Sequence, residues 1–181
     1  MDSIHGEYKP QILLLASRYD LTCDYVVAQL RRRSASYLRL NSEDLNESKI
    51  ELDPVGRCLI VEKKNEKFCV SPQYLKSVFF RRPVFLRDYG DDNRSPSERF
   101  SRIQWSAFIR NLMIFAEALW INHPVSIYKA EHKAYQLKVA AELGFSIPKT
   151  RITNTPRKDL FDSNSKPVAL KGIDTVLIRD A

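Results

Sequence analysis

The residues whose types best suit chemistry in this chain are cations at the ends of predicted elements. Lys171 ends an apolar strand-like run next to Gly172, and Lys133 lies at the start of a helical segment. Arg81 and Arg82 follow another apolar run. Ligands of α/β folds bind where buried strands end, and lysine and arginine there suit phosphate or carboxylate groups. From the residues alone, Lys171, Arg81 and Arg82 fit an anion-binding role and a structural role equally well, and Lys133 better fits an exposed helix position.

Each candidate also has a purely structural interpretation. Lys133 fits an exposed position on a helix, and Arg81 and Arg82 fit pairing with acidic neighbours, so both interpretations stay open. The run 31–33 is three arginines at the end of a helical pattern, where cations complement the helix dipole, so we favour a structural role there. The formal charge of +7 is compatible with a polyanionic partner, but the basic residues are scattered.

Other kinds of chemistry have no support in the sequence. It contains no phosphate-binding or dinucleotide-binding glycine pattern, no nucleophile motif, and no histidine at metal-ligand spacing from another ligand, so we assign neither catalytic nor metal-binding residues. The three cysteines form no C-x-x-C pair, and we expect Cys58 and Cys69 to be buried small hydrophobic residues. No apolar run approaches the roughly 20 residues of a membrane span, and no signal peptide opens the chain, so we expect a cytoplasmic protein without membrane contact.

The elements that must position the cations begin with an α/β pattern. The apolar run 11–17 predicts a strand buried on both faces, as in a parallel sheet. A helix follows, with Thr22 or Asp24 as its cap, and residues 36–41 form the next strand of a βαβ unit. Four more strands are predicted, two of them joined as a hairpin through residues 63–66. These four strands span residues 49–52, 58–62, 67–70 and 77–80.

The second part of the sequence is mainly helical. Ser95, Pro96 and Glu98 fit a capping box, and the apolar spacing after it predicts one long helix to residue 121. Two helical stretches follow, and Gly144 with Phe145 fits a Schellman ending for the second. Beyond them we expect an extended segment at 147–152 and two strands. These helices and strands span residues 124–130, 133–143, 168–171 and 175–178.

An ordered set of residues in the segment 120–171 resembles the beginning of the ATP-grasp fold. The shared features are an asparagine-proline turn, a helix with an early lysine that ends at glycine, an Ile-Pro-x-Thr strand, and a later strand ending in lysine. Upstream, the sequence Phe-Arg-Arg-Pro at 80–83 resembles an element of the ligases that mature microviridin-type ribosomal peptides (graspetides). The residues of the segment are Trp120–Pro124, Lys133, Gln136, Leu137, Ala140, Gly144, Phe145, Ile147, Pro148, Thr150, Asn154 and Pro167–Lys171.

The resemblance implies a fold and a chemistry. It implies a Rossmann-like pre-ATP-grasp domain at 1–123, with a mostly parallel sheet and flanking helices, and the incomplete first part of an ATP-grasp domain at 124–181. Ligases of this family use Mg-ATP to convert a carboxylate to an acyl phosphate, which an amine or hydroxyl then attacks. By analogy, Lys133 and Lys171 match the two lysines that approach the ATP phosphates, and Arg81 and Arg82 match an element that would contact a peptide substrate.

The sequence also departs from the family pattern. A single glycine, Gly172, follows the strand where the family has a glycine-rich loop, and the family's magnesium-binding carboxylates and asparagine do not occur before Ala181. We therefore expect residues 1–181 to be a piece or remnant of a ligase that alone binds no ATP or Mg²⁺ and performs no ligation. The alternatives are a module without chemistry that binds a peptide or protein partner or homodimerises and, less favoured, a basic nucleic-acid-binding domain.

Overall fold

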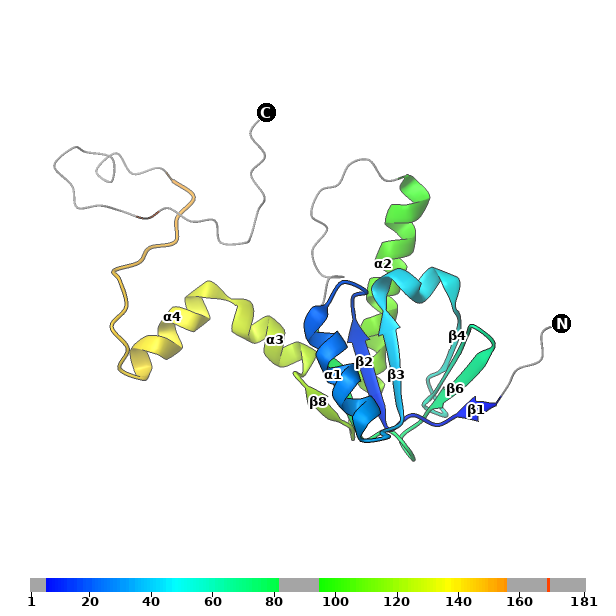
Figure 1. Ribbon diagram of the computed structural model, residues 1–181. Coiled ribbons are helices and arrows are strands. Elements are labelled where there is room, and N and C mark those ends of the chain that lie inside the picture. Colours follow the sequence, from blue (N-terminus) through cyan, green and yellow to red (C-terminus); the bar gives the residue numbers. More distant parts are fainter. Residues whose placement is uncertain (1–5, 82–94, 156–168, 170–181) are drawn as a thin grey trace. The chain divides into compact units, whose positions relative to one another are not determined.

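The computed structural model describes residues 6–81, 95–155 and 169 of the chain. The chain divides into two compact units, residues 1–124 and 125–181, and each is described by itself. The first unit contains every strand of the described part and the helices α1 and α2, whereas the described part of the second unit is helical and extended. Figure 1 shows these elements along the chain.

A four-stranded parallel sheet forms the centre of the first unit, with the strand order β3-β2-β7-β8. Every neighbouring pair in it is parallel, which confirms the predicted parallel sheet. Leu13 and Leu14 of β2 are fully buried although they point to opposite faces, so both faces of the sheet are covered. The strands are β2 (Ile12–Ala16), β3 (Tyr37–Asn41), β7 (Ser77–Phe80) and β8 (Leu119–Ile121).

Helix α1 (Leu21–Arg32) connects β2 to β3 and covers one face of the sheet (Figure 1). Its Cys23 and Val27 form a buried cluster with Leu14 of β2. The N-cap of α1 is Asp20, whose side chain accepts a hydrogen bond from the backbone N–H of Cys23 at 3.1 Å. The predicted caps, Thr22 and Asp24, are wrong because the helix begins earlier than the apolar spacing indicated.

A second, mixed sheet has the strand order β1-β6-β5-β4. Strands β5 and β6 form the predicted hairpin, and its turn residues Lys64 and Asn65 have positive φ angles of 50° and 63°. The short 3-10 helix η1 (Ser42–Glu47) leads from β3 into this sheet. The strands are β1 (Glu7–Tyr8), β4 (Lys49–Asp53), β5 (Cys58–Lys63) and β6 (Glu66–Val70).

The burial predicted for Cys58 and Cys69 is wrong. Both cysteines are half-buried and free, and their sulfur atoms lie 3.4 Å apart across the hairpin. Side chains alternate between the two faces of a strand, and the buried face of this hairpin carries Leu59 and Val70, which are fully buried. Cys58 and Cys69 therefore belong to the less covered face.

Helix α2 (Pro96–Asn111) begins with the predicted capping box between Ser95 and Glu98. The predicted continuation to residue 121 is wrong. The helix ends at Asn111, a 3-10 turn (η3, Leu112–Ile114) follows, and residues 119–121 form the edge strand β8. An apolar run does not by itself distinguish a buried helix from a buried strand, and here the parallel sheet takes up its end. Trp120 is buried in β8, and its Nε1 donates to the carbonyl of Phe115 at 3.0 Å.

The described part of the second unit contains α4 (Lys133–Glu142), and α3 (Pro124–Glu131) crosses the division between the units. The Schellman ending is confirmed: Gly144 has a φ of 81°, and the N–H of Phe145 donates to the carbonyl of Ala140 at 2.9 Å. Residues 147–152 form no strand, and the predicted strands 168–171 and 175–178 lie outside the described residues, except position 169.

Asp20, the N-cap of α1, also forms an ion pair with Arg81, the residue that follows β7. This double role yields a prediction about stability. We expect Asp20→Ala to lower the free energy of unfolding by about 2 kcal/mol, because it removes the cap of α1 and the buried partner of Arg81. Asp20→Asn keeps the cap acceptor but loses the charge, and we expect a smaller loss. Urea unfolding of the three proteins measures this, and an Asp20→Ala variant as stable as the wild type would contradict it.

Candidate functional site

The carboxyl ends of three parallel strands meet at one edge of the sheet. Ser17 follows β2, Asn41 ends β3, and Arg81 follows β7. Ligands of open α/β sheets bind outside this edge. A ligand of this sheet is therefore expected at this edge.

Arg81 lies at this edge, where its side chain is held by protein groups. Its Nε lies 3.2 Å from a carboxylate oxygen of Asp20, and its Nη2 donates to the hydroxyl of Thr22 at 3.3 Å. The Asp20 side chain is buried, whereas that of Arg81 is about half exposed. The structure thus provides the acidic neighbour that the sequence analysis left as one alternative for Arg81. Arg82 lies outside the described residues.

Arg39 joins the ends of β2 and β3. Its guanidinium donates to the carbonyl of Ser17 at 2.9 Å, to the side chain of Asn41 at 2.7 Å, and to the carboxylate of Asp24. Burial is the largest single influence and opposes its charge, but the hydrogen bond to Asp24 and the nearby charges, including those of Asp24 and Asp20, together outweigh burial, so the pKa of Arg39 is raised. Arg39 therefore connects two strands and α1 as a structural group.

Glu43 of η1 completes the edge. The Ser17 hydroxyl donates to one of its carboxylate oxygens at 2.6 Å, and the backbone N–H of Arg18 donates to the other at 2.9 Å. Partial burial tends to raise the pKa of Glu43, but these hydrogen bonds overcome that effect and hold the pKa below its ordinary value. Glu43 is therefore kept as a carboxylate that stabilises the loop after β2.

The chemistry available at this edge follows from these contacts. Asp20, Asp24, Glu43 and Asp44 each accept from an arginine or from a serine hydroxyl in the same network. Within the described part of the chain, no three histidine, cysteine or acidic side chains gather closely enough to hold a metal ion. The described part of the edge is thus an internally satisfied network of charges that positions the strand ends.

Lys133 is the one predicted cofactor-binding residue that the structure describes. It is exposed at the first position of α4, and the preceding His132 makes no side-chain hydrogen bond to cap that helix. Lys171 lies outside the described residues. Lys133 and Arg81 belong to different units, so the structure does not test whether the four predicted residues share one site.

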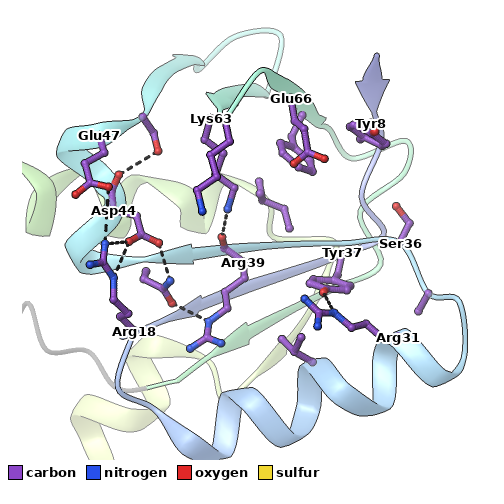
Figure 2. A pocket seen from close by; sticks show the side chains of 17 residues that line it. Tyr8, Arg18, Arg31, Ser36, Tyr37, Arg39, Asp44, Glu47, Lys63 and Glu66 are labelled. Carbon is purple, nitrogen blue, oxygen red and sulfur yellow. Dashed lines mark hydrogen bonds and ion pairs between the residues drawn. The ribbon is translucent and has the colours of Figure 1, made fainter. Parts of the chain in front are cut away.

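A cavity of about 1020 Å³ lies within the first unit, between β3 and α1 on one side and the β5–β6 hairpin on the other (Figure 2). The sequence alone does not predict this cavity, because its walls come from five separate segments. The only signals were the arginine run at 31–33 and the Lys63-Lys64 pair. Its lining residues are Tyr8, Arg18, Val27, Arg31, Ala35, Ser36, Tyr37, Leu38, Arg39, Asn41, Asp44, Glu47, Ser48, Lys63, Lys64, Glu66 and Phe68.

The wall of the cavity combines charge with aromatic surface. Lys63 donates to the backbone carbonyl of Arg39 at 2.7 Å, and its ammonium lies 5.8 Å from the ring centre of Phe68. On the opposite wall, Arg31 donates to the Tyr37 hydroxyl at 3.0 Å. Figure 2 shows Lys63 reaching from the hairpin toward the strand of Arg39, and Arg31 and Tyr37 side by side near α1. Such a wall suits a ligand that carries both carboxylates and apolar groups.

The Ser17–Glu43 contact predicts a pH-dependent contribution to stability. A lowered carboxyl pKa stabilises the folded state above the unfolded value of about 4.3, and this contribution is lost as the pH falls through the folded value. We expect Ser17→Ala to cost about 1 kcal/mol at pH 7 and less at pH 3. Urea unfolding at both pH values measures this.

Ser36→Ala is the matched control, because the Ser36 hydroxyl donates to a backbone carbonyl, that of Lys9, at 3.3 Å. Its cost has no carboxylate to titrate and should be the same at both pH values. A Ser17→Ala cost that is equally independent of pH would show that the hydroxyl does not lower the pKa of Glu43.

Comparison with known proteins supports one relationship, at the level of fold. No protein-family model matches the sequence, and no curated protein matches it. The structure resembles the macrocyclase MdnB from Microcystis aeruginosa MRC, with 23% identity and a TM-score of 0.56 over 80% of this chain and 54% of that one. The macrocyclase MdnC, solved with the precursor peptide MdnA, has 20% sequence identity and a TM-score of 0.64, over 80% of this chain and 48% of MdnC.

Two ligases of the same kind extend the comparison. The ATP-grasp ligase PsnB, solved with a minimal precursor, gives 16% identity and a TM-score of 0.60 over 77% of this chain and 45% of that one. A RiPP-associated ATP-grasp ligase from Chryseobacterium gregarium has 18% sequence identity and a TM-score of 0.61, over 82% of this chain and 45% of the ligase. The chain spans about half the length of these proteins. The chain therefore has the fold of the amino-terminal half of peptide-modifying ATP-grasp ligases, which confirms the predicted fold class and resemblance.

Proposed function

We propose that this chain supplies the amino-terminal domain and the opening of the nucleotide-binding domain of an ATP-dependent ligase that modifies a ribosomal peptide. The observation that carries the proposal is the fold shared with MdnB, MdnC and PsnB over about four-fifths of the chain. The solved structures of MdnC and PsnB contain precursor peptides, and PsnB complexes with Mg and ADP are also known. The ordered residues of segment 120–171 add support independent of the coordinates.

The proposed assignment divides the chain at the helix that follows the parallel sheet. Residues 1–123 would form the pre-ATP-grasp domain, and residues 124–181 the first part of the ATP-grasp domain. This agrees with the compact units, whose division falls after Pro124. Helix α4 would then be the helix that carries the early lysine of the nucleotide pocket.

Lys133 suits a role beside a triphosphate. It is exposed at the amino-terminal end of α4, where the helix dipole adds positive potential. We propose that Lys133 and Lys171 place their ammonium groups against the phosphates. When bound, Mg-ATP would supply the phosphoryl group that activates a carboxylate as an acyl phosphate, and an amine or hydroxyl would attack to give an amide or ester.

The magnesium ion itself has no proposed ligands in this chain. Among the described residues, no cluster of acidic, histidine or cysteine side chains fits a metal ion. We therefore assign no step of the reaction to a metal-binding residue here. We propose that residues 1–181 alone bind no Mg-ATP and form no peptide crosslink.

A second candidate function is a peptide-binding module without its own chemistry. It is favoured by the cavity beside β3, which lies wholly within the first unit and uses none of the proposed nucleotide-binding residues. Homodimerisation is compatible with this function. A nucleic-acid-binding role is less favoured, because Arg33 and Arg81 donate to protein groups and three acidic residues line the cavity.

The ligase and the peptide-binding module differ in the role of Lys133 and Lys171, which bind phosphates only in the ligase. In the complete reading frame that contains this chain, we expect Lys133→Met and Lys171→Met each to reduce peptide-dependent ADP release by about a hundredfold or more, because each removes a charge from the phosphates. Lys138→Met is the matched control, since Lys138 lies on the same helix and pairs with Glu142. Unchanged ADP release in both test variants would contradict the lysine assignment.

A further inference from the structure

The cavity in the first unit runs along the unpaired edge of strand β3. Strand β3 is the end strand of the parallel sheet, and β2 is its only partner among the described strands. The carbonyl of Ser36 accepts from the N–H groups of Gln11 and Ile12, so it points toward β2. Because successive residues of a parallel strand direct their backbone groups to opposite sides, those of Tyr37 and Arg39 point away from β2.

Lys63 shows that this second side of β3 faces the cavity. Its ammonium reaches across from the β5–β6 hairpin and donates to the carbonyl of Arg39 at 2.7 Å (Figure 2). The edge of β3 thus offers backbone donors and acceptors to whatever occupies the space. An exposed strand edge of this kind is a template for another extended chain.

Lys63 is also a cation without an acidic partner. No carboxylate among the described residues lies within ion-pair distance of its ammonium, and its contacts are a carbonyl and the Phe68 ring. Burial is the main reason that its pKa is lowered, although Asp44 and Glu66 act in the opposite direction from farther away. A half-buried ammonium in this position is stabilised when an anion enters the cavity.

The remaining charges of the cavity wall determine which ligand charge it favours. Arg18 is paired with Asp44 and Glu47, and Arg39 is paired outside the cavity, with Asp24. Within the described part of the chain, Arg31, Lys63 and Lys64 have no such carboxylate partner. The wall therefore carries three cations without a carboxylate partner, Arg31, Lys63 and Lys64, and three acids, Asp44, Glu47 and Glu66.

Aromatic side chains cover another part of the wall. The ring of Tyr8 stacks on Phe68 with their centres 5.4 Å apart, and Tyr37 lies on the strand edge itself. Side chains of an added strand would alternate between two directions. Such a strand can therefore direct carboxylates to the cations and apolar groups to the rings.

We propose that the cavity beside β3 binds an extended acidic peptide segment, which adds to the sheet as a strand and directs its carboxylates to Lys63, Arg31 and Lys64. A peptide is favoured over a nucleic acid, because a phosphate backbone is charged at every unit and would meet the three acids of the wall. The inference rests on the proposed function in one respect only: the precursor peptide of the ligase would be the source of the segment.

The test uses the ¹⁵N-labelled chain 1–181 and the peptide Val-Glu-Val-Glu-Val-Glu-Val in the absence of ATP. We expect the backbone amide signals of Tyr37 and Arg39 to shift on titration. The same peptide with alternate backbone nitrogens methylated keeps every charge but loses strand hydrogen bonds, and we expect it to bind about tenfold more weakly. The lysine analogue of the peptide should not bind.

The protein side of the test separates local from general charge effects. Lys63→Met should weaken binding about fivefold or more, since it removes a charge-assisted contact. Lys76→Met loses the same charge at an exposed residue outside the cavity and should bind like the wild type. If Lys63→Met does not fold, the comparison of methylated and unmethylated peptides on the wild-type chain decides.

Three results would overturn the proposal: no binding, equal binding of the methylated peptide, or complete displacement by equimolar free glutamate or inorganic phosphate. The last result would indicate a simple anion site. Because ATP is absent, failure here leaves the ligase assignment in place. Conversely, peptide binding without any ADP release by the complete reading frame would retain this site and reject the ligase.

Discussion

Residues 13–16 of β2 are almost completely buried, and the arrangement of the first unit follows from that constraint. A strand covered on both faces needs a neighbour on each side and a layer over each face. Strands β3 and β7 supply the neighbours, and α1 covers the face that carries Leu14. The chain satisfies the constraint with all four strands of this sheet parallel, which brings the strand ends and their polar residues to one edge.

The charges of the first unit then divide into two groups. Those at the carboxyl edge, including Asp20, Arg39 and Glu43, are held by one another and by backbone groups, and they fix the strand ends. Of the cations around the cavity, Arg31, Lys63 and Lys64 lack an acidic partner within the described part, whereas Arg18 is paired with Asp44. Internally matched charges stabilise a structure, whereas unmatched ones beside a strand edge favour a ligand.

Local signals in the sequence predicted most of the elements. The capping box at Ser95 and the Schellman ending at Gly144 depend on neighbouring residues only, and both are confirmed. Strand β8 was missed because its apolar residues satisfy a helical pattern equally well, and only the sheet decides between the two. The half-buried Cys58 was missed because the face that a strand buries depends on its partners. The cavity was missed for the same reason, since its walls are distant in sequence.

The fold shared with MdnB, MdnC and PsnB supports the central proposal, which is a chemical one: we propose that this chain serves in joining a carboxylate to an amine or hydroxyl of a peptide. The most direct test is mass spectrometry of ribosomal peptides rich in acidic, lysine and hydroxyl side chains after incubation with the complete reading frame and Mg-ATP. The account predicts the loss of one water per bond formed, and only with ATP. Peptide masses that stay unchanged with ATP, for peptides that bind the protein, would contradict it.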